Sequence, residues 1–135
     1  MAGVGRSDGG GAPLHAAAIV EQWQERAWGR CDLTAVDDLI AEPFVRHNRD
    51  GTTKRTHAEL KADLREYQKV LGHPVIEVRD RVVDGNNVWS RTTMRGANLH
   101  TGETRVVDWI QVHRIENGRI AEVWTLHAVD ADWGC

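Results

Sequence analysis

Residues 104–128 read TRVVDWIQVHRI-ENG-RIAEVWTLHA, and this stretch decides the fold that the sequence predicts. Val, Ile and Trp are dense on both sides of the Asn-Gly pair at 117–118, which is the strongest short-range signal of a β-hairpin. Side chains alternate between the two faces of a strand, so Trp109, Gln111 and His113 share one face. An indole, an amide and an imidazole on one face predict a lined ligand cavity rather than a plain hydrophobic core.

The rest of the chain predicts helices first and strands afterwards. Apolar residues recur at helical spacing in the early segments and alternate in the later ones. Thr56 followed by Glu59 is a capping box, which opens a helix. The expected order is a helix from 14 to about 29, a short helix to about 42, a strand at 44–48, a helix from 56 to about 72, strands at 75–83 and 88–99, and the hairpin. This segregation predicts an α+β fold in which helices cover one face of a curved antiparallel sheet.

The chain has 135 residues, enough for one domain with its own hydrophobic core. Its glycine-rich start, MAGVGRSDGGGAP, predicts a flexible tail at 1–13, followed by a single domain at 14–135. The tail has no hydrophobic region, so we do not expect a secretory signal. Cys31 and Cys135 can pair, but nothing requires it, and we expect a reduced cytoplasmic protein.

Charge and hydropathy exclude two classes of partner. Seventeen basic and twenty acidic side chains give a net charge of −3, so we expect no surface for nucleic acid or for an anionic membrane. No apolar run approaches the roughly 20 residues of a membrane-spanning helix. The seven histidines form no H-x-H motif, no H-E-x-x-H motif and no cluster with cysteine, so we expect neither a metal nor another cofactor.

Three segments together carry a resemblance to a known superfamily. They are CDLTAVDDLIAEPFVRHN at 31–48, DGNNVWSRTTMRG at 84–96 and HRIENGRIAEVW at 113–124. In this order and spacing the chain, from 14 to about 128, resembles the nuclear transport factor two-like superfamily, specifically its SnoaL-like polyketide cyclase and ketosteroid isomerase branches. The resemblance implies a cone-shaped fold, in which three N-terminal helices wrap a bent sheet around a pocket for a small apolar organic ligand.

The resemblance implies roles for three residues. His47 stands where the isomerases carry the aspartate that shuttles a proton, and where cyclase-like members carry a histidine facing the pocket. Gln111 stands at the protonated aspartic acid of the isomerase oxyanion hole, and its amide can donate a hydrogen bond there. Trp23 lies near the oxyanion-hole tyrosine but lacks the hydroxyl. The isomerase pair is therefore not reproduced.

The end of the last predicted strand departs from the cyclase pattern. Ala128 stands where the cyclases keep an acid/base aspartate, with His127 before it and Asp130 two residues beyond. A β-bulge could bring either side chain to that position. Two places remain open for His127: the pocket, shared with Trp109, Gln111 and Thr125, or the rim.

The candidate site residues fall into two roles. Histidine titrates near neutrality and an amide can donate to a ligand oxygen, the two abilities that proton transfer beside a carbonyl requires. The predicted catalytic residues are His47, Gln111 and His127. The predicted substrate-binding residues are Trp23, Trp109, Trp124, Thr125 and Tyr67. The alternative for the histidines and Gln111 is hydrogen bonding within the protein, and for the aromatic residues it is the core.

Three functions remain open. The first is a cofactor-independent cyclase, isomerase or lyase acting on an apolar carbonyl compound, polyketide- or steroid-like, by proton transfer, aldol closure or dehydration. The second is a non-catalytic protein that binds a small molecule in the same pocket, and the third is a dimerising scaffold domain. We prefer the first because His47 and Gln111 are expected to face one hollow. A sheet face rich in Val, Ile and Arg also predicts a homodimer.

Overall fold

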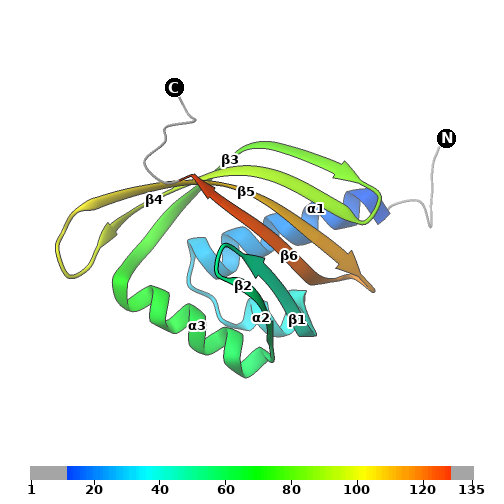
Figure 1. The fold of residues 1–135 in the computed structure, drawn as a ribbon, viewed down its shortest axis with the longest axis horizontal. Helices are drawn as coiled ribbons and strands as arrows, with labels where there is room; N and C mark the ends of the chain where they lie inside the picture. Colours follow the sequence, from blue (N-terminus) through cyan, green and yellow to red (C-terminus); the bar gives the residue numbers. More distant parts are fainter. Residues whose placement is uncertain (1–11, 129–135) are drawn as a thin grey trace.

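Residues 12–128 are described by the structure, a computed structural model, and in them a curved sheet lies against a group of helices (Figure 1). The helices are α1 (Ala12–Trp23), the π-helix η1 (Gln24–Gly29), α2 (Thr34–Leu39) and α3 (His57–Val70). The strands are β1 (Ile40–Asn48), β2 (Gly51–Arg55), β3 (Leu71–Asp84), β4 (Asn87–Asn98), β5 (Thr104–Glu116) and β6 (Arg119–Ala128). The tail predicted at 1–13 lies, except for its last two residues, outside the described part, and so do Asp130 and Cys135.

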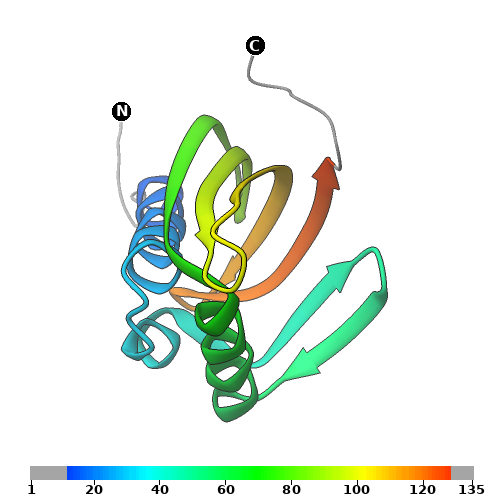
Figure 2. The same cartoon turned by 90° about the vertical axis from the view of Figure 1, so that its left-hand side faces the viewer.

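The six strands form one open sheet in the order β2-β1-β6-β5-β4-β3. This confirms the predicted α+β architecture, with one correction: β1 and β6 are parallel, so the sheet is mixed rather than antiparallel. The parallel pair arises because the chain passes through β2, α3 and the β3–β5 meander before it returns beside β1. Figure 2 shows the resulting bend, with the β1–β2 hairpin beside α3 and α1 beside β3.

The turn between β5 and β6 confirms the hairpin predicted from the Asn-Gly pair. Asn117 and Gly118 have φ values of 52° and 77°. Positive φ at both central residues is the type I′ geometry, whose twist matches that of the flanking strands. The turn therefore begins the antiparallel pairing of β5 with β6.

The short second helix is the main local correction. It ends at Leu39 rather than near residue 42, because Ile40 already has extended backbone and pairs with Ile120 of β6. Both isoleucines are fully buried. Strand β2 at 51–55 was not expected, because its sequence GTTKR is polar and exposed and lacks the alternation that signals a strand.

The core lies between the helices and the sheet. The capping box of α3 is present as predicted, with Thr56 and Glu59 each bonded to the other's backbone, and it directs Leu60 and Leu64 inward. Tyr67, for which the core was the alternative to substrate binding, is 48% exposed. The main cluster of buried apolar side chains consists of Ala16, Val20, Trp23, Ala27, Ala35, Val36, Leu39, Ile40, Phe44, Leu60, Leu64, Val88, Ile115, Ile120 and Val123.

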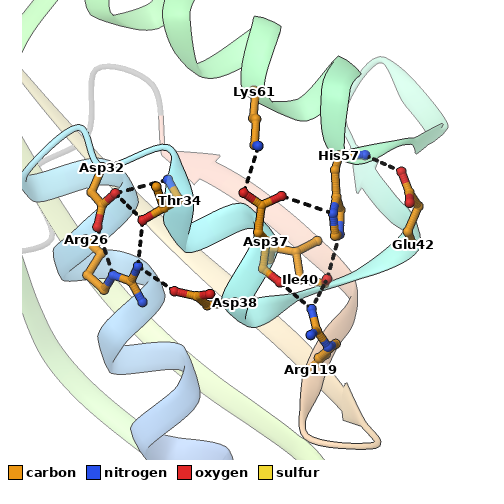
Figure 3. A network of polar contacts seen from close by, with 10 residues as sticks. All are labelled: Arg26, Asp32, Thr34, Asp37, Asp38, Ile40, Glu42, His57, Lys61 and Arg119. Carbon is orange, nitrogen blue, oxygen red and sulfur yellow. Dashed lines mark hydrogen bonds and ion pairs between the residues drawn. The ribbon is translucent and has the colours of Figure 1, made fainter.

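A network of polar contacts holds η1 against α2 (Figure 3). The guanidinium of Arg26 donates to Asp32 at 3.0 Å, to Thr34 at 3.0 Å and to Asp38 at 2.8 Å. Asp32 also accepts hydrogen bonds from the backbone and the hydroxyl of Thr34. The hydroxyl bond, followed by the bond from Arg26, is the largest cause that lowers the pKa of Asp32. The loop between the two helices is therefore fixed by charge-assisted hydrogen bonds.

The same network continues to β1, α3 and β6 (Figure 3). Lys61 donates to Asp37 at 2.8 Å, and this bond is the largest cause that lowers the pKa of Asp37. His57 Nε2 donates to the carbonyl of Ile40 at 2.8 Å, and Arg119 Nη1 donates to the carbonyl of Asp37 at 2.5 Å. The start of β1 is thereby held to α3 and to β6, its parallel partner.

Truncating Leu64 tests how far α3 depends on its buried face. Leu64 is 2% exposed, so we expect Leu64→Ala to lower the free energy of unfolding by about 2–5 kcal/mol, through lost burial and the cavity left behind. Val70 on the same helix is 44% exposed, and Val70→Ala should change stability by less than about 0.5 kcal/mol. Urea unfolding followed by circular dichroism measures both. Equal losses in the two variants would contradict this packing.

Candidate active site

The register of four strands aligns one polar row on the sheet. Arg81 of β3 pairs with Ser90 of β4, Ser90 pairs with Gln111 of β5, and Gln111 pairs with Thr125 of β6. Paired residues project to the same face of a sheet. Arg81 donates from Nη2 to Gln24 Oε1 of η1 at 2.7 Å, so this is the face that the helices cover. We call these four sheet residues the first row.

A second row lies two residues further along the same strands. Thr92 of β4 pairs with Trp109 of β5, and Trp109 pairs with His127 of β6. The Trp109 ring meets the His127 ring edge to face, with centroids 5.5 Å apart, and meets Trp28 of η1 at 6.5 Å. Trp28 in turn meets Tyr67 of α3 at 5.2 Å. An aromatic chain therefore runs from the end of β6 across the sheet to α3.

Four of the predicted site residues come together in these rows. Gln111 Nε2 donates to Thr125 Oγ1 at 3.1 Å, and Trp109 and His127 are in contact in the adjacent row. His127 lies at the exposed end of the second row, and the shielding of part of its ring lowers its pKa. Its imidazole is therefore neutral at pH 7 and able to accept a proton.

Several polar atoms of this face are buried and have no hydrogen-bond partner within residues 12–128. They are Gln24 Nε2, Arg81 Nε, Ser90 Oγ, Thr92 Oγ1, Trp109 Nε1 and His113 Nδ1. A buried polar group without a partner costs about 1–3 kcal/mol, so native proteins bond such groups to water or to a ligand. Their concentration here makes this face the candidate surface for water or a ligand.

His113, predicted on the same strand face as Trp109 and Gln111, is fully buried. It pairs with Val88 and Val123 on the helix-facing side and is 2% exposed. Burial, and next the charge of Arg81, lower its pKa to about 3. The ring is therefore neutral throughout the physiological range and does not exchange protons there.

His113 makes stability depend on pH. Its pKa of about 3 in the folded state lies below the ordinary value of 6.5, so the unfolded state binds the proton more readily. Its contribution is complete above pH 6.5 and is lost as pH falls toward 3, by roughly 1 kcal/mol per pH unit in mid-range. His113→Gln does not titrate, so its unfolding free energy should fall less steeply. Urea titrations from pH 7 to 4 compare the slopes, and parallel profiles would argue against this role.

His47 lies on the opposite face of the sheet. It pairs with Trp124 of β6, the neighbour of Thr125, and successive residues of a strand point to opposite faces. The His47 and Trp124 rings are stacked, with centroids 5.1 Å apart and an interplanar angle of 11°. The prediction that His47 and Gln111 face one hollow is therefore wrong. The cause is the register of the parallel β1–β6 pair, which no local pattern in the sequence specifies.

On this outer face His47 belongs to a hydrogen-bonded cluster. Its Nδ1 contacts Thr52 Oγ1 at 2.8 Å, and its Nε2 contacts Glu122 Oε2 at 2.5 Å. Glu122 Oε1 also accepts from Arg114 Nε at 2.9 Å. The bond with His47 is the largest cause that lowers the pKa of Glu122. This cluster fastens β2, β1, β6 and β5 to one another.

The other predicted ligand-binding aromatics lie apart from the two rows. Trp23 is 4% exposed within the hydrophobic core, and Trp124 lies on the outer face. Tyr67 reaches the rows only through Trp28. Sequence reasoning missed Ser90 and Thr92, although a signal was present: they are the two hydroxyls in the alternating series 88, 90, 92, 94, whose other members are Val and Met.

A small cleft adjoins the second row. It lies between η1, α3 and β4 and is lined by Ala27, Trp28, Cys31, Leu64, Tyr67, Gln68, Leu71, Pro74 and Met94. Its free volume of about 10 Å³ is close to the least that holds one water. Met94 follows Thr92 on the same face of β4, so the cleft leads from the surface toward the second row.

Neither a cluster of metal ligands nor a helix fit to cross a membrane occurs within residues 12–128. No three His, Cys, Asp or Glu side chains of this part gather as a metal site would require. None of its helices has the length and apolar character needed to cross a membrane.

The fold and part of the sequence match known proteins. A candidate polyketide cyclase from Acidithiobacillus ferrooxidans superposes with a TM-score of 0.75 at 16% identity, covering 84% of this chain and 87% of that one. IdmH, a candidate polyketide cyclase from Streptomyces antibioticus, gives 0.72 at 23% identity, covering 83% and 91%. A protein with a ketosteroid isomerase-like fold from Catenulispora acidiphila, in complex with trimethylamine, gives 0.71 at 14% identity, covering 82% and 85%.

These structures confirm the predicted nuclear transport factor two-like fold. A comparison with curated proteins finds no match. The SnoaL-like domain matches residues 20–123, which is most of the chain. The chain therefore belongs to the SnoaL-like domain family.

Proposed function

We propose that the chain is a cofactor-independent enzyme that moves a proton beside the carbonyl of a small organic substrate, with His127 as the base. The observation that supports this most is the convergence of Trp109, Gln111, Thr125 and His127 on one face of β5 and β6. A neutral imidazole beside hydrogen-bond donors is the combination that enolate chemistry needs. The family match and the cyclase-like fold neighbours agree with this class of reaction.

The proposed step needs no oxidant or reductant. His127 takes a proton from the carbon next to the carbonyl, and the electron pair of the broken C–H bond moves onto the carbonyl oxygen as an enolate. The indole N–H of Trp109, buried and without a partner among the described residues, and the amide of Gln111 can donate to that oxygen. Return of the proton to another carbon is an isomerisation, and attack of the enolate carbon on a second carbonyl is an aldol closure.

Deuterium exchange tests the base directly. We expect the protein to accelerate exchange of the α-protons of 2-tetralone in D₂O, observed by NMR. His127→Gln should slow the exchange on the order of 10²-fold or more, because it removes the base. Gln111→Leu should slow it on the order of 10²-fold, through loss of a donor to the enolate. Because the pKa of His127 is lowered, the wild-type rate should rise with pH to a plateau with its midpoint below 6.5.

His47→Gln is the matched control for this experiment. It removes an imidazole on the outer face, so the exchange rate should stay within about threefold of wild type. Loss of exchange in His47→Gln with normal exchange in His127→Gln would overturn the assignment of the base.

A non-catalytic ligand-binding protein is the second candidate. It is favoured by one contact: the amide of Gln111 already donates to Thr125 Oγ1, as in a preformed binding surface. This candidate requires that 2-tetralone quench the tryptophan fluorescence while its α-protons exchange at the uncatalysed rate. The exchange experiment therefore separates the two.

We also propose that the chain forms a homodimer through the outer face of its sheet. Exposed large apolar side chains gather there across the strands, and we call them the outer patch: Val82, Trp89, Val106, Trp124 and Leu126. Exposed apolar side chains gathered on one face are typical of an interaction site. A patch on a regular sheet can pair with its own copy around a two-fold axis.

Leu126→Glu tests the dimer. Leu126 is 64% exposed on β6 within the outer patch, two residues from Trp124, and a charge there should convert the dimer to a monomer in sedimentation analysis at micromolar concentration. Leu99→Glu is the matched control, because Leu99 is 58% exposed in the turn between β4 and β5. A wild-type protein that is monomeric at 100 µM would refute the proposal.

A further inference from the structure

One end of the first row holds three buried polar atoms that need a hydrogen-bond acceptor. Gln24 Nε2 and Arg81 Nε, which can only donate, and Ser90 Oγ, which can donate, have no partner within residues 12–128. Ser90 is the cross-strand neighbour of Arg81, and Arg81 is bonded to Gln24, so the three lie side by side. We call them the donor cluster. It lies at the β3–β4 side of the sheet, away from His127 on β6.

The donor cluster carries positive charge that is only partly balanced. Arg81 Nη2 donates to the neutral amide oxygen of Gln24, and Nη1 lies 3.5 Å from Glu21 Oε2. The Glu21 side chain is 59% exposed, whereas that of Arg81 is 18% exposed, so solvent weakens this pair. The neighbouring His113 is buried and neutral at pH 7. A buried guanidinium edge beside two neutral donors is suited to an anionic acceptor.

We infer that Gln24, Arg81 and Ser90 bind a carboxylate group of the substrate. The two oxygens of a carboxylate offer acceptor sites for all three donors at once, and its single negative charge matches one guanidinium. A phosphate dianion would leave one charge unbalanced in a buried place. The substrate is then a carbonyl compound that also carries a carboxylate, rather than the apolar carbonyl compound that the sequence suggested.

The position of the donor cluster also sets the length of the substrate. Neighbouring strands lie about 4.8 Å apart. The centre between β3 and β4 is two strand spacings from the centre between β5 and β6, which is about 10 Å. This part of the inference rests on the proposed function, since it takes His127 and Gln111 as the reactive end. The carboxylate and the reactive carbonyl are therefore about 10 Å apart.

Binding of a matched pair of probes tests the donor cluster. The anion 2-naphthoate and the neutral 2-naphthamide have nearly the same shape and differ in charge. In isothermal titration calorimetry at pH 7, we expect the protein to bind 2-naphthoate at least about tenfold more tightly than 2-naphthamide. This is the usual gain from a charge-assisted hydrogen bond. Arg81→Gln should lower the affinity for 2-naphthoate about tenfold or more and change the affinity for 2-naphthamide less than about threefold.

Two further variants keep the test specific. Ser90→Ala removes one neutral donor, and it should weaken 2-naphthoate more than 2-naphthamide even if Arg81→Gln does not fold. Arg79→Gln is the matched control, because Arg79 lies on the same strand with a similar side-chain exposure of 22%. It donates instead to Thr93 Oγ1 on the outer face, so both probes should bind it as they bind wild type.

The inference fails if wild type binds 2-naphthoate no more tightly than 2-naphthamide, or if neither probe binds with a Kd below 1 mM. It also fails if Arg81→Gln and Arg79→Gln lower the affinity for 2-naphthoate equally. Each of these results would mean that only water occupies the donor cluster. The readout is binding, so it is independent of turnover. Acid-selective binding without any α-proton exchange would uphold the carboxylate site and refute the proposed catalysis.

Discussion

The pairing register of the central strands is the constraint on which the rest of the structure depends. Side chains alternate strictly along a strand, so each pairing decides which residues share a face. Through β5 the register joins Gln111 to both Ser90 and Thr125, and it joins Trp109 to Thr92. These antiparallel pairings gather polar groups beneath the helices, although the residues come from separate parts of the sequence.

The two faces of the sheet are chemically distinct as a result. The helix-facing side combines a hydrophobic core with a band of hydroxyl, amide, indole and guanidinium groups, several of them unsatisfied within the described chain. The other side carries exposed indoles and a histidine–glutamate–arginine cluster whose hydrogen bonds are made within the protein. The unmet hydrogen bonds on the helix-facing side agree with the proposed ligand surface, and the internal hydrogen bonds of the outer cluster join strands to one another.

The elements that short sequence motifs specify could be predicted from the sequence. The Asn-Gly turn locates the β5–β6 hairpin, but the pairing of Gln111 with Thr125 also depends on an extra residue in β6, Ala121, which shifts the register by one. The capping box likewise locates α3. The face of His47 does not follow, because β1 joins β6 across 75 residues and its register depends on contacts of α2 and α3 with the sheet. The environment of Arg81 does not follow either, because only the tertiary structure places Gln24 beside it.

The orientation of Trp28 depends on the length of the π-helix η1. Its wider turn, seen in the bond from the Arg30 amide to the Glu25 carbonyl at 2.9 Å, carries Gln24 near one end and Trp28 near the other. A helix wound one residue tighter would rotate everything beyond the deletion by about 100°. Trp28 would then turn away from Trp109 while Gln24 stayed in place. A one-residue deletion in η1 would thus alter the Trp28 end of the proposed ligand surface and preserve the Gln24 end.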